Sequence, residues 1–580
     1  MFGAATQNGV GIGLGNIPTL TSLPYNVQLN LAVQQLFASG EPGFWLDPSD
    51  LSTMYQDSAG TTPVTAVEQP VGLILDKSQG LVLGAEVITP VANQNFSSDT
   101  GFWQKETGWA ITGGFAVATN AATSYALRKD PLLVANTYYQ VTFTIVSISA
   151  GALRIYASGN YSASFSTPGT YTLRILNGSG TNSFQISALG TTTATVSYIS
   201  AKPVLGTHYY QSTAGVRPVL SARYNQLVGT EFKNGVTDAP TRGGLLSATT
   251  LTGYGGALAF GYDGSTTSYA YQNASSTNGP GTLSVVVQMT DGNAPTFGSG
   301  SASSSANSFA LVVGGNPVSP LTYSVAPLTN SCYRVTLAVG TFTATLFAGI
   351  AKYNTNDNRT FKVTAYDCRP SDQATGLIPT YQRVNTSTDY DTAGFPLYLS
   401  GNGTQWMQCA AQDYTGVNKM LVCAGVRKLS DAALGVITEL SANYGSNNGT
   451  FYVGAGASSA ARYGFGAKAT KYAGYEPATF AAPITNVLSC AYDLSTATQA
   501  SQIQPRINGT LNQTNGFVEA GGPTTGAFGN YAAYLFSRAG ATNFFTGNIY
   551  QLIARGSTVA SNAAQIAATE SWVDLKTKAY

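Results

Sequence analysis

The chain has 580 residues, of which only 9% are charged, and its formal net charge at pH 7 is +1. Nucleic acid and anionic membranes demand clustered Lys and Arg, and the chain has no such run, so both are excluded as partners. Helical surfaces are usually rich in Glu, Lys and Arg, so a composition dominated by Gly, Ser, Thr, Asn and Tyr predicts an all-β protein.

Length and cysteine usage limit the architecture. At roughly 100 to 200 residues per domain, the chain is long enough for three or four units. The five cysteines are odd in number and show no CxxC spacing, which argues against a zinc site or a disulfide framework. We therefore expect buried free thiols and folding in a reducing cytoplasm, with no metal or cofactor. The cysteines are Cys332, Cys368, Cys409, Cys423 and Cys490.

Residues 1–42 are interpreted as an arm and a helix that attach the protein to an assembly. Residues 1–24 are rich in glycine and uncharged, a composition that has little reason to fold alone. Apolar residues in 25–37 have helical spacing, and Gly40 and Pro42 end that helix. The N-terminal region lacks the basic and apolar parts of a secretory signal, and no apolar run reaches the ~20 residues of a membrane span. A disordered leader is the alternative.

Residues 43–78 contain short strands and turns that cannot form a domain alone. Asp, Ser, Gly, Thr and Pro are interspersed with Phe44, Trp45 and Tyr55, a pattern typical of strands that pack on another sheet. The stretch resembles a segment of tailed-bacteriophage virion proteins that precedes a concanavalin A-like (laminin G-like) sandwich. In that family, a Gln-Ser-Thr segment ending in Arg-Pro-Val-Leu follows soon after.

The later segments of this family are present, but far downstream. Residues 211–220 carry the Gln-Ser-Thr and Arg-Pro-Val-Leu pattern, and 381–396 carry Tyr-Gln-Arg-Val-Asn-Thr, Asp-Tyr-Asp-Thr and Gly-Phe-Pro. Residues 545–556 are similar to the closing strand of the family, and 564–573 to its terminal helix. The resemblance implies a single sandwich interrupted twice. We call it the host sandwich, and it is expected to comprise residues 43–83, 204–228 and 373–580.

The first insert, residues 84–203, is predicted to be a β-sandwich. Alternating strands of about 4 to 8 residues recur between turn signals, for example at 138–146, 153–156 and 169–175. The order of its Gly-Trp, Tyr-x-Val-Thr-Phe-Thr and Gly-Thr-Tyr strands is similar to carbohydrate-binding modules of the jelly-roll type. Such modules stack aromatic rings on sugar faces and use amides for the hydroxyls. The resemblance makes candidates of Trp103, Trp109, Tyr156, Tyr161 and Gln185, although a Trp on a strand is more often a core residue.

The second insert, residues 229–372, has the same strand spacing and is predicted to be another sandwich. Its segment 333–337 echoes 139–143 of the first insert. The sole histidine, His208, lies at the junction of the host sandwich with the first insert. A lone His without neighbouring ligands is a poor metal ligand or base, so a structural or solvated role is expected.

No catalytic motif stands out, so the protein is not expected to be an enzyme. Glycan hydrolysis needs two carboxyl groups held close together. Asp47, Asp50 and Asp57 are close in sequence but lie among Pro, Ser and Gly, where Asp caps turns. Lectin-like sandwiches often bind calcium, yet a calcium site is not expected, although three aspartates could serve. These are Asp389, Asp391 and Asp413.

The family resemblance implies a bacteriophage virion protein, a fibre, spike or head-decorating appendage that contacts host surface glycans. Its expected partners are other virion proteins through the N-terminal arm, further copies of itself, usually as trimers, and host glycans. A virion-associated glycan depolymerase and a purely structural capsid or tail protein stay open as alternatives. The expected location is the virion, after synthesis in the host cytoplasm.

Overall fold

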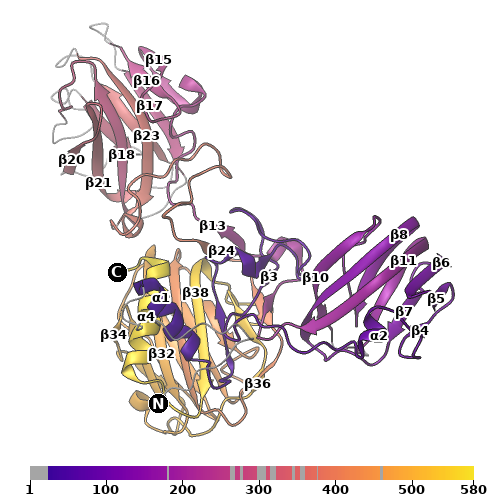
Figure 1. The fold of residues 1–580 in the computed structure, drawn as a ribbon. Coiled ribbons are helices and arrows are strands. Elements are labelled where there is room, and N and C mark those ends of the chain that lie inside the picture. Colours follow the sequence, from indigo (N-terminus) through magenta and orange to yellow (C-terminus); the bar gives the residue numbers. More distant parts are fainter. Residues whose placement is uncertain are drawn as a thin grey trace, which may run out of the picture.

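The computed structural model is all-β, which confirms the fold class predicted from composition. It describes residues 24–580 except 179, 181, 262–267, 275–278, 297–308, 314–321, 343–345, 353–358, 375 and 458–460. Figure 1 shows three bodies, with one sandwich in the centre and a smaller body on each of two sides. The arm before Pro24 lies outside the described residues.

Two sheets form the central sandwich, and both draw strands from distant parts of the chain. Sheet A has the order β13-β24-β38-β27-β32-β33-β34, with β1 paired to β38. Gly43 of β1 lies opposite Arg555 of β38, in antiparallel register. The strands of sheet A are β1 (Gly43–Leu46), β13 (Val219–Ser221), β24 (Tyr398–Asn402), β27 (Lys419–Lys428), β32 (Ile484–Asp493), β33 (Ile503–Ile507), β34 (Thr510–Leu511) and β38 (Thr546–Ser557).

Sheet B faces sheet A and has the order β2-β3-β12-β25-β37-β28-β29-β30-β31-β35. Its strands are β2 (Met54–Tyr55), β3 (Leu73–Ile74), β12 (Tyr209–Tyr210), β25 (Met407–Cys409), β28 (Gly435–Leu440), β29 (Thr450–Ala457), β30 (Arg462–Lys468), β31 (Tyr472–Tyr475), β35 (Gly516–Val518) and β37 (Ala533–Leu535). A further pair, β26 (Gln412–Asp413) and β36 (Asn530–Tyr531), lies beside it. Phe44, Leu399, Phe451 and Leu552 are among the residues that fill the core between the two sheets.

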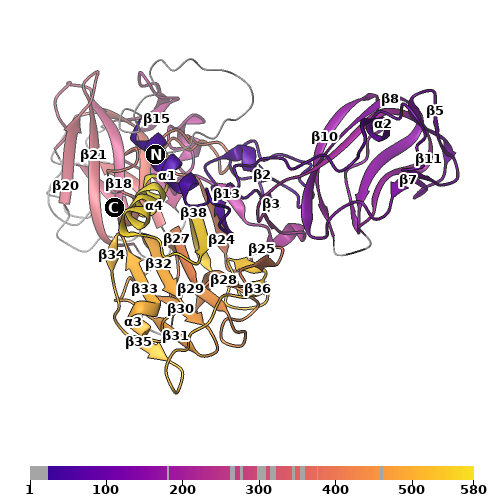
Figure 2. The ribbon, with the colours of Figure 1, turned by 60° about the horizontal axis from the view of Figure 1, so that its bottom comes forward.

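Two helices cover the outer face of sheet A. They are α1 (Tyr25–Gln35) and α4 (Ala563–Thr577), which pack against each other (Figure 2). Leu29 and Val33 of α1 share a buried cluster with Trp45 and Trp572. Asn562 and Gln565 form a capping box at the start of α4. The helices predicted at both ends of the chain are confirmed, and two four-residue helices were not predicted, α2 (Val91–Gln94) and α3 (Gln499–Gln502).

The first insert folds around two long strands that each take part in two layers. The strands β8 and β11 pair along most of their length and shift register near Leu189 and Thr193. On one side of this shift, β10, β6 and β5 extend the two long strands into one layer. On the other side, β9, β7 and β4 extend them into a second layer. The strands are β4 (Gln104–Lys105), β5 (Trp109–Thr112), β6 (Phe115–Ala121), β7 (Ala126–Lys129), β8 (Thr137–Ala157), β9 (Asn160–Tyr161), β10 (Gly169–Asn177) and β11 (Phe184–Pro203).

The second insert contains a four-stranded sheet, β14-β17-β22-β19, and a six-stranded sheet, β15-β16-β23-β18-β21-β20. Leu283, Val335 and Ile350 are among the residues buried between them. The strands are β14 (Thr241–Gly243), β15 (Leu246–Thr249), β16 (Ala257–Phe260), β17 (Ser268–Ala274), β18 (Gly279–Met289), β19 (Phe309–Val313), β20 (Thr322–Pro327), β21 (Cys332–Phe342), β22 (Leu346–Lys352) and β23 (Phe361–Pro370). Among the described residues, short 3-10 helices also lie at Leu51–Thr53, Ala214–Val216, Gly235–Asp238 and Ser371–Gln373.

The first junction, where the chain leaves and re-enters the central sandwich around the first insert, is closed by Asp76 and His208. Both side chains are buried. The Asp76 carboxylate accepts hydrogen bonds from the backbone N–H of Trp45, Ser78 and Thr207 at 2.7 to 2.8 Å. His208 Nδ1 accepts from the Asp76 N–H at 3.0 Å, so the ring is neutral and its Nε2–H donates to the Val204 carbonyl at 3.2 Å. The histidine has the structural role expected for it.

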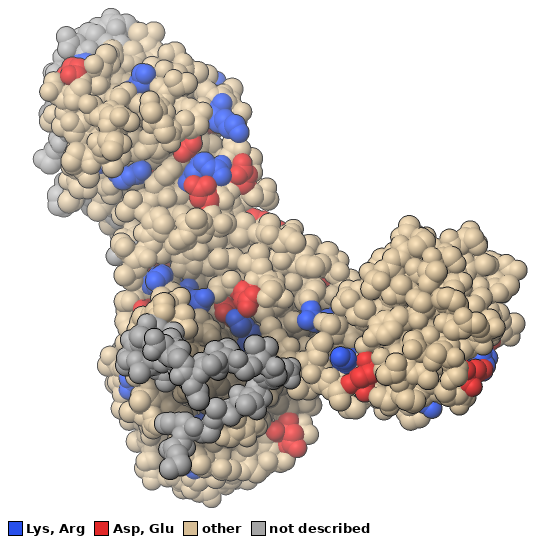
Figure 3. Space-filling model, in the orientation of Figure 1, with Lys and Arg blue, Asp and Glu red and all other residues tan. Residues whose placement is uncertain are grey.

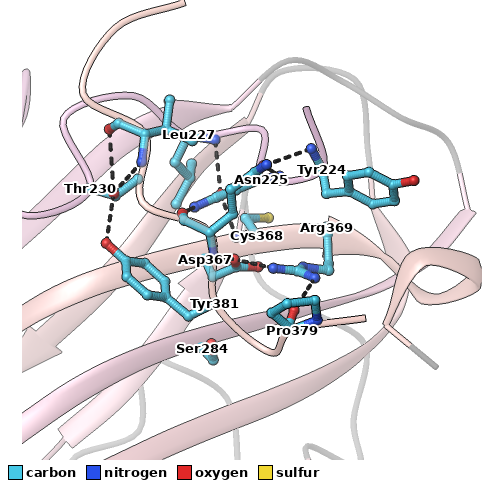
Figure 4. Close-up of polar contacts among 12 residues, drawn as sticks. Tyr224, Asn225, Leu227, Thr230, Ser284, Asp367, Cys368, Arg369, Pro379 and Tyr381 are labelled. Atoms are coloured by element: carbon cyan, nitrogen blue, oxygen red, sulfur yellow. Dashed lines mark hydrogen bonds and ion pairs between the residues drawn. The ribbon is translucent and has the colours of Figure 1, made fainter. Parts of the chain in front are cut away.

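The second junction is closed by amides and one buried ion pair (Figure 4). The Asn225 side chain donates to the carbonyls of Tyr366 and Gln382 and accepts from the Cys368 N–H at 2.9 Å. Asp367 pairs with Arg369, and Arg369 Nη1 also donates to the Pro379 carbonyl at 2.8 Å. Two segments that are distant in sequence are thereby tied together where they enter and leave the second insert.

Charged residues are sparse on the surface. Figure 3 shows a few Lys, Arg, Asp and Glu side chains, singly or in small groups of both signs, on a largely uncharged face. The five cysteines are all buried and unpaired, which confirms the expectation of free thiols. No helix in the described part of the chain combines the length and apolar character that crossing a membrane requires.

Candidate functional site

The outer face of sheet B carries a row of paired residues that are polar or aromatic except for two glycines. Leu535, Phe451 and Phe465 are adjacent in sequence to residues of this row, and they point into the core. Strand alternation therefore places the row on the opposite face. Each member of the row lies directly opposite the next on the neighbouring strand. Across the sheet, the row is Tyr210, Gln408, Tyr534, Glu439, Tyr452, Gly466, Gly474 and Phe517.

Glycines on β29 and β30 leave room for one ring to lie flat on the sheet. A Cβ built on Gly464 would lie 2.5 Å from the Tyr452 hydroxyl, and one on Gly466 would lie closer still to the Tyr452 ring. Tyr444 stacks on this ring with the two centroids 4.2 Å apart and an interplanar angle of 28°. Tyr452 is thus buried, and half-buried Tyr444 forms the outer layer.

A buried ion pair holds Tyr444 in place. Glu439, with 0% exposure, accepts hydrogen bonds from Arg538 Nε at 2.9 Å and from the Tyr444 N–H. Burial raises the pKa of Glu439, whereas the charge of Arg538 and these hydrogen bonds lower it. The Arg538 guanidinium also lies 5.6 Å from the centroid of the Tyr444 ring. Backbone, charge and ring contacts therefore all restrict the orientation of Tyr444.

Further half-buried rings extend this surface in both directions. Tyr472 lies 6.4 Å from Tyr444 and 6.2 Å from Phe517, measured between ring centroids. On the other side, Trp406 lies 6.4 Å from Tyr534. We call these five side chains the aromatic face: Trp406, Tyr444, Tyr472, Phe517 and Tyr534. Rigid rings beside amide and hydroxyl groups suit a ligand that has both an apolar face and a polar rim.

The first insert borders one end of this row. Tyr138 of the insert and Tyr210 of β12 have ring centroids 6.3 Å apart and share a cluster with Leu73 and Val204. A pocket of about 230 Å³ lies at this corner, lined by residues of both bodies, including Tyr138, Tyr210 and Gln412. At this end, the row is therefore bordered by the first insert and by this pocket, and not by open solvent.

Trp103 and Trp109, which the sequence proposed as ligand platforms, lie in the core of the first insert. They are only 3% and 6% exposed. Trp103 Nε1 donates to the Asn93 carbonyl at 2.9 Å, and Trp109 Nε1 donates to the Tyr125 carbonyl at 3.2 Å. Their rings pack on protein atoms of the sandwich core, so we remove both tryptophans from the candidate site.

Tyr156, Tyr161 and Gln185 are brought together by the structure. Gln185 pairs with Tyr156, and Tyr156 pairs with Tyr161, on the neighbouring strands β11, β8 and β9. The row continues through two polar residues on β7 and β4, and we call all five the insert row: Gln104, Arg128, Gln185, Tyr156 and Tyr161.

The insert row offers less open ring surface than the aromatic face. Tyr161 is 42% exposed, but the Arg154 guanidinium lies 3.6 Å from its ring centroid and covers one side. Tyr156 contacts the same ring with centroids 4.7 Å apart. The Gln185 amide donates to Ser183 Oγ at 2.9 Å. The insert row is thus a second, smaller candidate surface.

The aspartates considered for catalysis or calcium have local partners. Asp47, Asp50 and Asp57 accept hydrogen bonds from nearby backbone N–H groups, which confirms their predicted role in turns. Asp389 and Asp391 both pair with Arg383 at 3.1 Å. Asp413 accepts from the Thr415 N–H at 2.8 Å.

Sequence reasoning missed the aromatic face. The signal was available in the alternation of β29 and β30, where Tyr452 and Gly454 on one strand are followed by Gly464 and Gly466 on the next. Glycines at every second position leave one face of a strand without side chains, which marks a place where a ring or backbone approaches closely.

Comparisons with known proteins add little to this geometry. The chain is similar to the N-terminal CBM22-1-CBM22-2 tandem domain of Xyn10C from Paenibacillus barcinonensis, with 9% identity, 50% of this chain and 98% of that chain covered, and a TM-score of 0.20. It is also similar to Trypanosoma rangeli sialidase in complex with 2,3-difluorosialic acid, with 8% identity, 90% of each chain covered and a TM-score of 0.19. No protein-family pattern and no curated protein sequence matches the chain. TM-scores this low carry no argument about fold or function.

Proposed function

We propose that this protein is a bacteriophage virion appendage that contacts host surface glycans through the aromatic face of sheet B. The observation that carries glycan binding is the set of half-buried rings on sheet B, of which Tyr444 is held in place by Tyr452, Glu439 and Arg538. A pyranose has an apolar C–H face that stacks on such rings, and its hydroxyls can meet the amide of Gln408 and the tyrosine hydroxyls.

The virion assignment rests on the sequence resemblance of the segments at 43–78, 211–220 and 381–396. We assign attachment to the arm before Tyr25, because the apolar side of α1 is already packed on Trp45 and Trp572. The proposed assembly is a homo-oligomer, most simply a trimer, since several weak glycan sites on one particle combine into high avidity.

We propose binding without hydrolysis. A retaining or inverting glycosidase places two carboxyl groups about 5 to 9.5 Å apart beside the scissile bond. Glu439 is the carboxylate at the centre of the row, but it is fully buried, and its two oxygens accept from Arg538 and the Tyr444 N–H. This placement supports a role in orienting Tyr444, rather than a role as a general acid.

The test is binding of the purified chain to an array of bacterial surface glycans. We expect at least one glycan to bind, and Tyr444→Ala combined with Tyr472→Ala to weaken that binding. Each aromatic contact contributes roughly 0.5–1.5 kcal/mol, so losing two rings corresponds to a loss of affinity of about 5-fold to about 160-fold. The same glycan is then incubated with the protein and assayed for new reducing ends.

Tyr25→Ala is the matched control, because Tyr25 is 63% exposed and lies on α1, away from sheet B. It should bind like the unaltered protein. Binding that survives the double substitution on sheet B but is lost on changing Tyr156 and Tyr161 would move the site to the insert row. Release of reducing ends would favour the depolymerase alternative, and failure to bind any glycan would favour a purely structural role.

A further inference from the structure

The second insert has a pocket of about 240 Å³ that is separate from the aromatic face. It lies between the six-stranded sheet of the insert and residues 376–380, which lead back to the central sandwich. The lining residues that matter here are Thr282, Ser284, Arg334, Thr336, Ile378 and Pro379. Figure 4 shows Ser284, Arg369 and Pro379 in the neighbourhood of the second junction.

Strand alternation places the polar side chains of β18 and β21 on the pocket side of the sheet. Leu283 and Val335 point into the core of the insert, so Ser284 and Thr336 point outward. Ser284 lies directly opposite Thr336 in the register of the two strands. Three hydroxyls and one guanidinium thus form one wall, while Ile378 and Pro379 form an apolar wall.

The pocket contains one cation that no carboxylate neutralises. Arg369 is paired with Asp367 and bonded to the Pro379 carbonyl. Arg334 donates from Nη1 to Ser284 Oγ at 3.0 Å and lies 5.2 Å from the Tyr381 ring centroid. Within the described ranges, Arg334 forms no ion pair. Burial lowers the pKa of Arg334, although the charge of Asp367 raises it. The guanidinium would therefore gain from an anion that entered the pocket.

Size and charge select the kind of anion. Pockets for drug-sized ligands measure roughly 300–1,000 Å³, so this pocket suits a single ring. Arg334, Arg369 and Asp367 together carry one net positive charge, which matches a carboxylate better than a phosphate group with about −1.5 to −2. Guanidinium groups bind carboxylates through two parallel hydrogen bonds.

We propose that this pocket binds one carboxylate-bearing monosaccharide unit, a hexuronic acid or similar acidic sugar, with its carboxylate on Arg334. The hydroxyls of Thr282, Ser284 and Thr336 meet the sugar hydroxyls, and Ile378 and Pro379 pack on its C–H face. This site goes beyond the proposed function, because it requires no contact with the aromatic face and selects for acidic sugars.

The experiment is titration calorimetry on the full chain with methyl β-D-glucuronide, methyl β-D-glucoside and sodium acetate. We expect the glucuronide to bind, the glucoside to bind at least tenfold more weakly, and acetate not to compete with the glucuronide at equal concentration. Arg334→Gln should reduce glucuronide affinity tenfold or more. Thr336→Val keeps the shape and the charge but removes one hydroxyl, so it should reduce affinity by a smaller factor.

Arg242→Gln is the matched control, because Arg242 lies on β14 of the same insert and donates to the Ala239 carbonyl. Its affinity should be unchanged, and thermal melts of all variants verify folding. Should Arg334→Gln fail to fold, the Thr336→Val result and the preference for glucuronide over glucoside still decide the question. Equal binding of glucuronide and glucoside, competition by acetate, unaltered affinity in Arg334→Gln or in Thr336→Val, or no binding at all would overturn the proposal.

The proposal and the glycan-binding function fail in different ways. Loss of glucuronide binding in Arg334→Gln, with retention in the Tyr444→Ala and Tyr472→Ala protein, supports this pocket independently of the aromatic face. A glucuronide signal that disappears only with the sheet B rings would assign the acidic sugar to the aromatic face and refute the pocket.

Discussion

The two junctions of the central sandwich solve the same problem with different chemistry. Each must hold two chain segments side by side where an inserted body begins and ends. The first junction uses Asp76 and His208, two buried groups that titrate, whereas the second uses the amides of Asn225 and Gln382 with the Asp367–Arg369 pair. The comparison teaches that two connections with the same task can be built from different chemistry, and that the first contains two groups whose pKa values are shifted by burial.

The largest expected effect is at the second junction. Arg369→Met leaves Asp367 buried without its cation, which we expect to lower the free energy of unfolding by about 3–5 kcal/mol. Replacing both partners, as in Asp367→Leu with Arg369→Met, should recover at least half of that loss, because no uncompensated charge is left. Calorimetric unfolding of both proteins measures the difference. Equal losses in the single and double variants would show that hydrogen bonds, and not charge, dominate this junction.

The first junction should reveal two opposing pH dependences. Burial lowers the pKa of His208 to about 4, so its contribution to stability is complete above the ordinary His pKa and is lost as pH falls toward 4. Burial raises the pKa of Asp76 to about 6, against hydrogen bonds that lower it, so stability falls as pH rises from about 4 to 6. Each shift corresponds to ~3 kcal/mol, and in the unaltered protein they nearly cancel between pH 4 and 6.

Single substitutions separate these two contributions. In Asp76→Asn, His208 is the one of these two junction groups that still titrates. Its contribution to the free energy of unfolding should therefore fall by ~3 kcal/mol as pH decreases from 6.5 to 4. His208→Asn retains an oxygen that can accept from the Asp76 N–H, and its free energy of unfolding should instead fall by a similar amount as pH increases from 4 to 6. Denaturant titrations across this range measure both slopes, and Arg369→Met provides the comparison at the other junction. Parallel pH profiles for the two Asn variants would contradict the assignment.

The smallest expected effect concerns one hydrogen bond of the first junction. Ser78 Oγ donates to Asp76 Oδ2 at 2.7 Å. Removing it in Ser78→Ala should lower the free energy of unfolding at pH 7 by about 1.5–3 kcal/mol, since the bond is made to a charged group. The effect should shrink as pH falls below about 6, where Asp76 becomes protonated in the folded protein. A loss of equal size at pH 7 and at pH 4 would point to packing instead.

Local patterns predicted the elements of this protein better than the surfaces those elements build. Composition predicted the all-β class, turn residues predicted the roles of Asp47 and Asp50, and helical spacing predicted the N-terminal helix. The C-terminal helix was expected from the family resemblance. No local pattern reveals that Trp45 and Gln551, 506 positions apart, are hydrogen-bonded neighbours. The row on sheet B likewise depends on strand pairing, because it joins residues from Tyr210 to Phe517 that are distant in the sequence.

The candidates in the first insert illustrate a second limit. Alternation shows that two side chains share a face, but not which face meets solvent. Trp103 and Trp109 had the residue type of a ligand platform and turned out to fill the core, whereas Tyr156, Tyr161 and Gln185 lie together on the outside. Residue type alone therefore could not separate a buried ring from an accessible one.

The helices and the aromatic face lie on opposite sides of the central sandwich. α1 and α4 cover sheet A, and the rings lie on the outer side of sheet B. Attachment through the chain ahead of α1 would hold the molecule on the sheet A side. Every copy would then present its rings away from the anchoring surface. The stacking of the two sheets would therefore fix the orientation of the binding face relative to that surface.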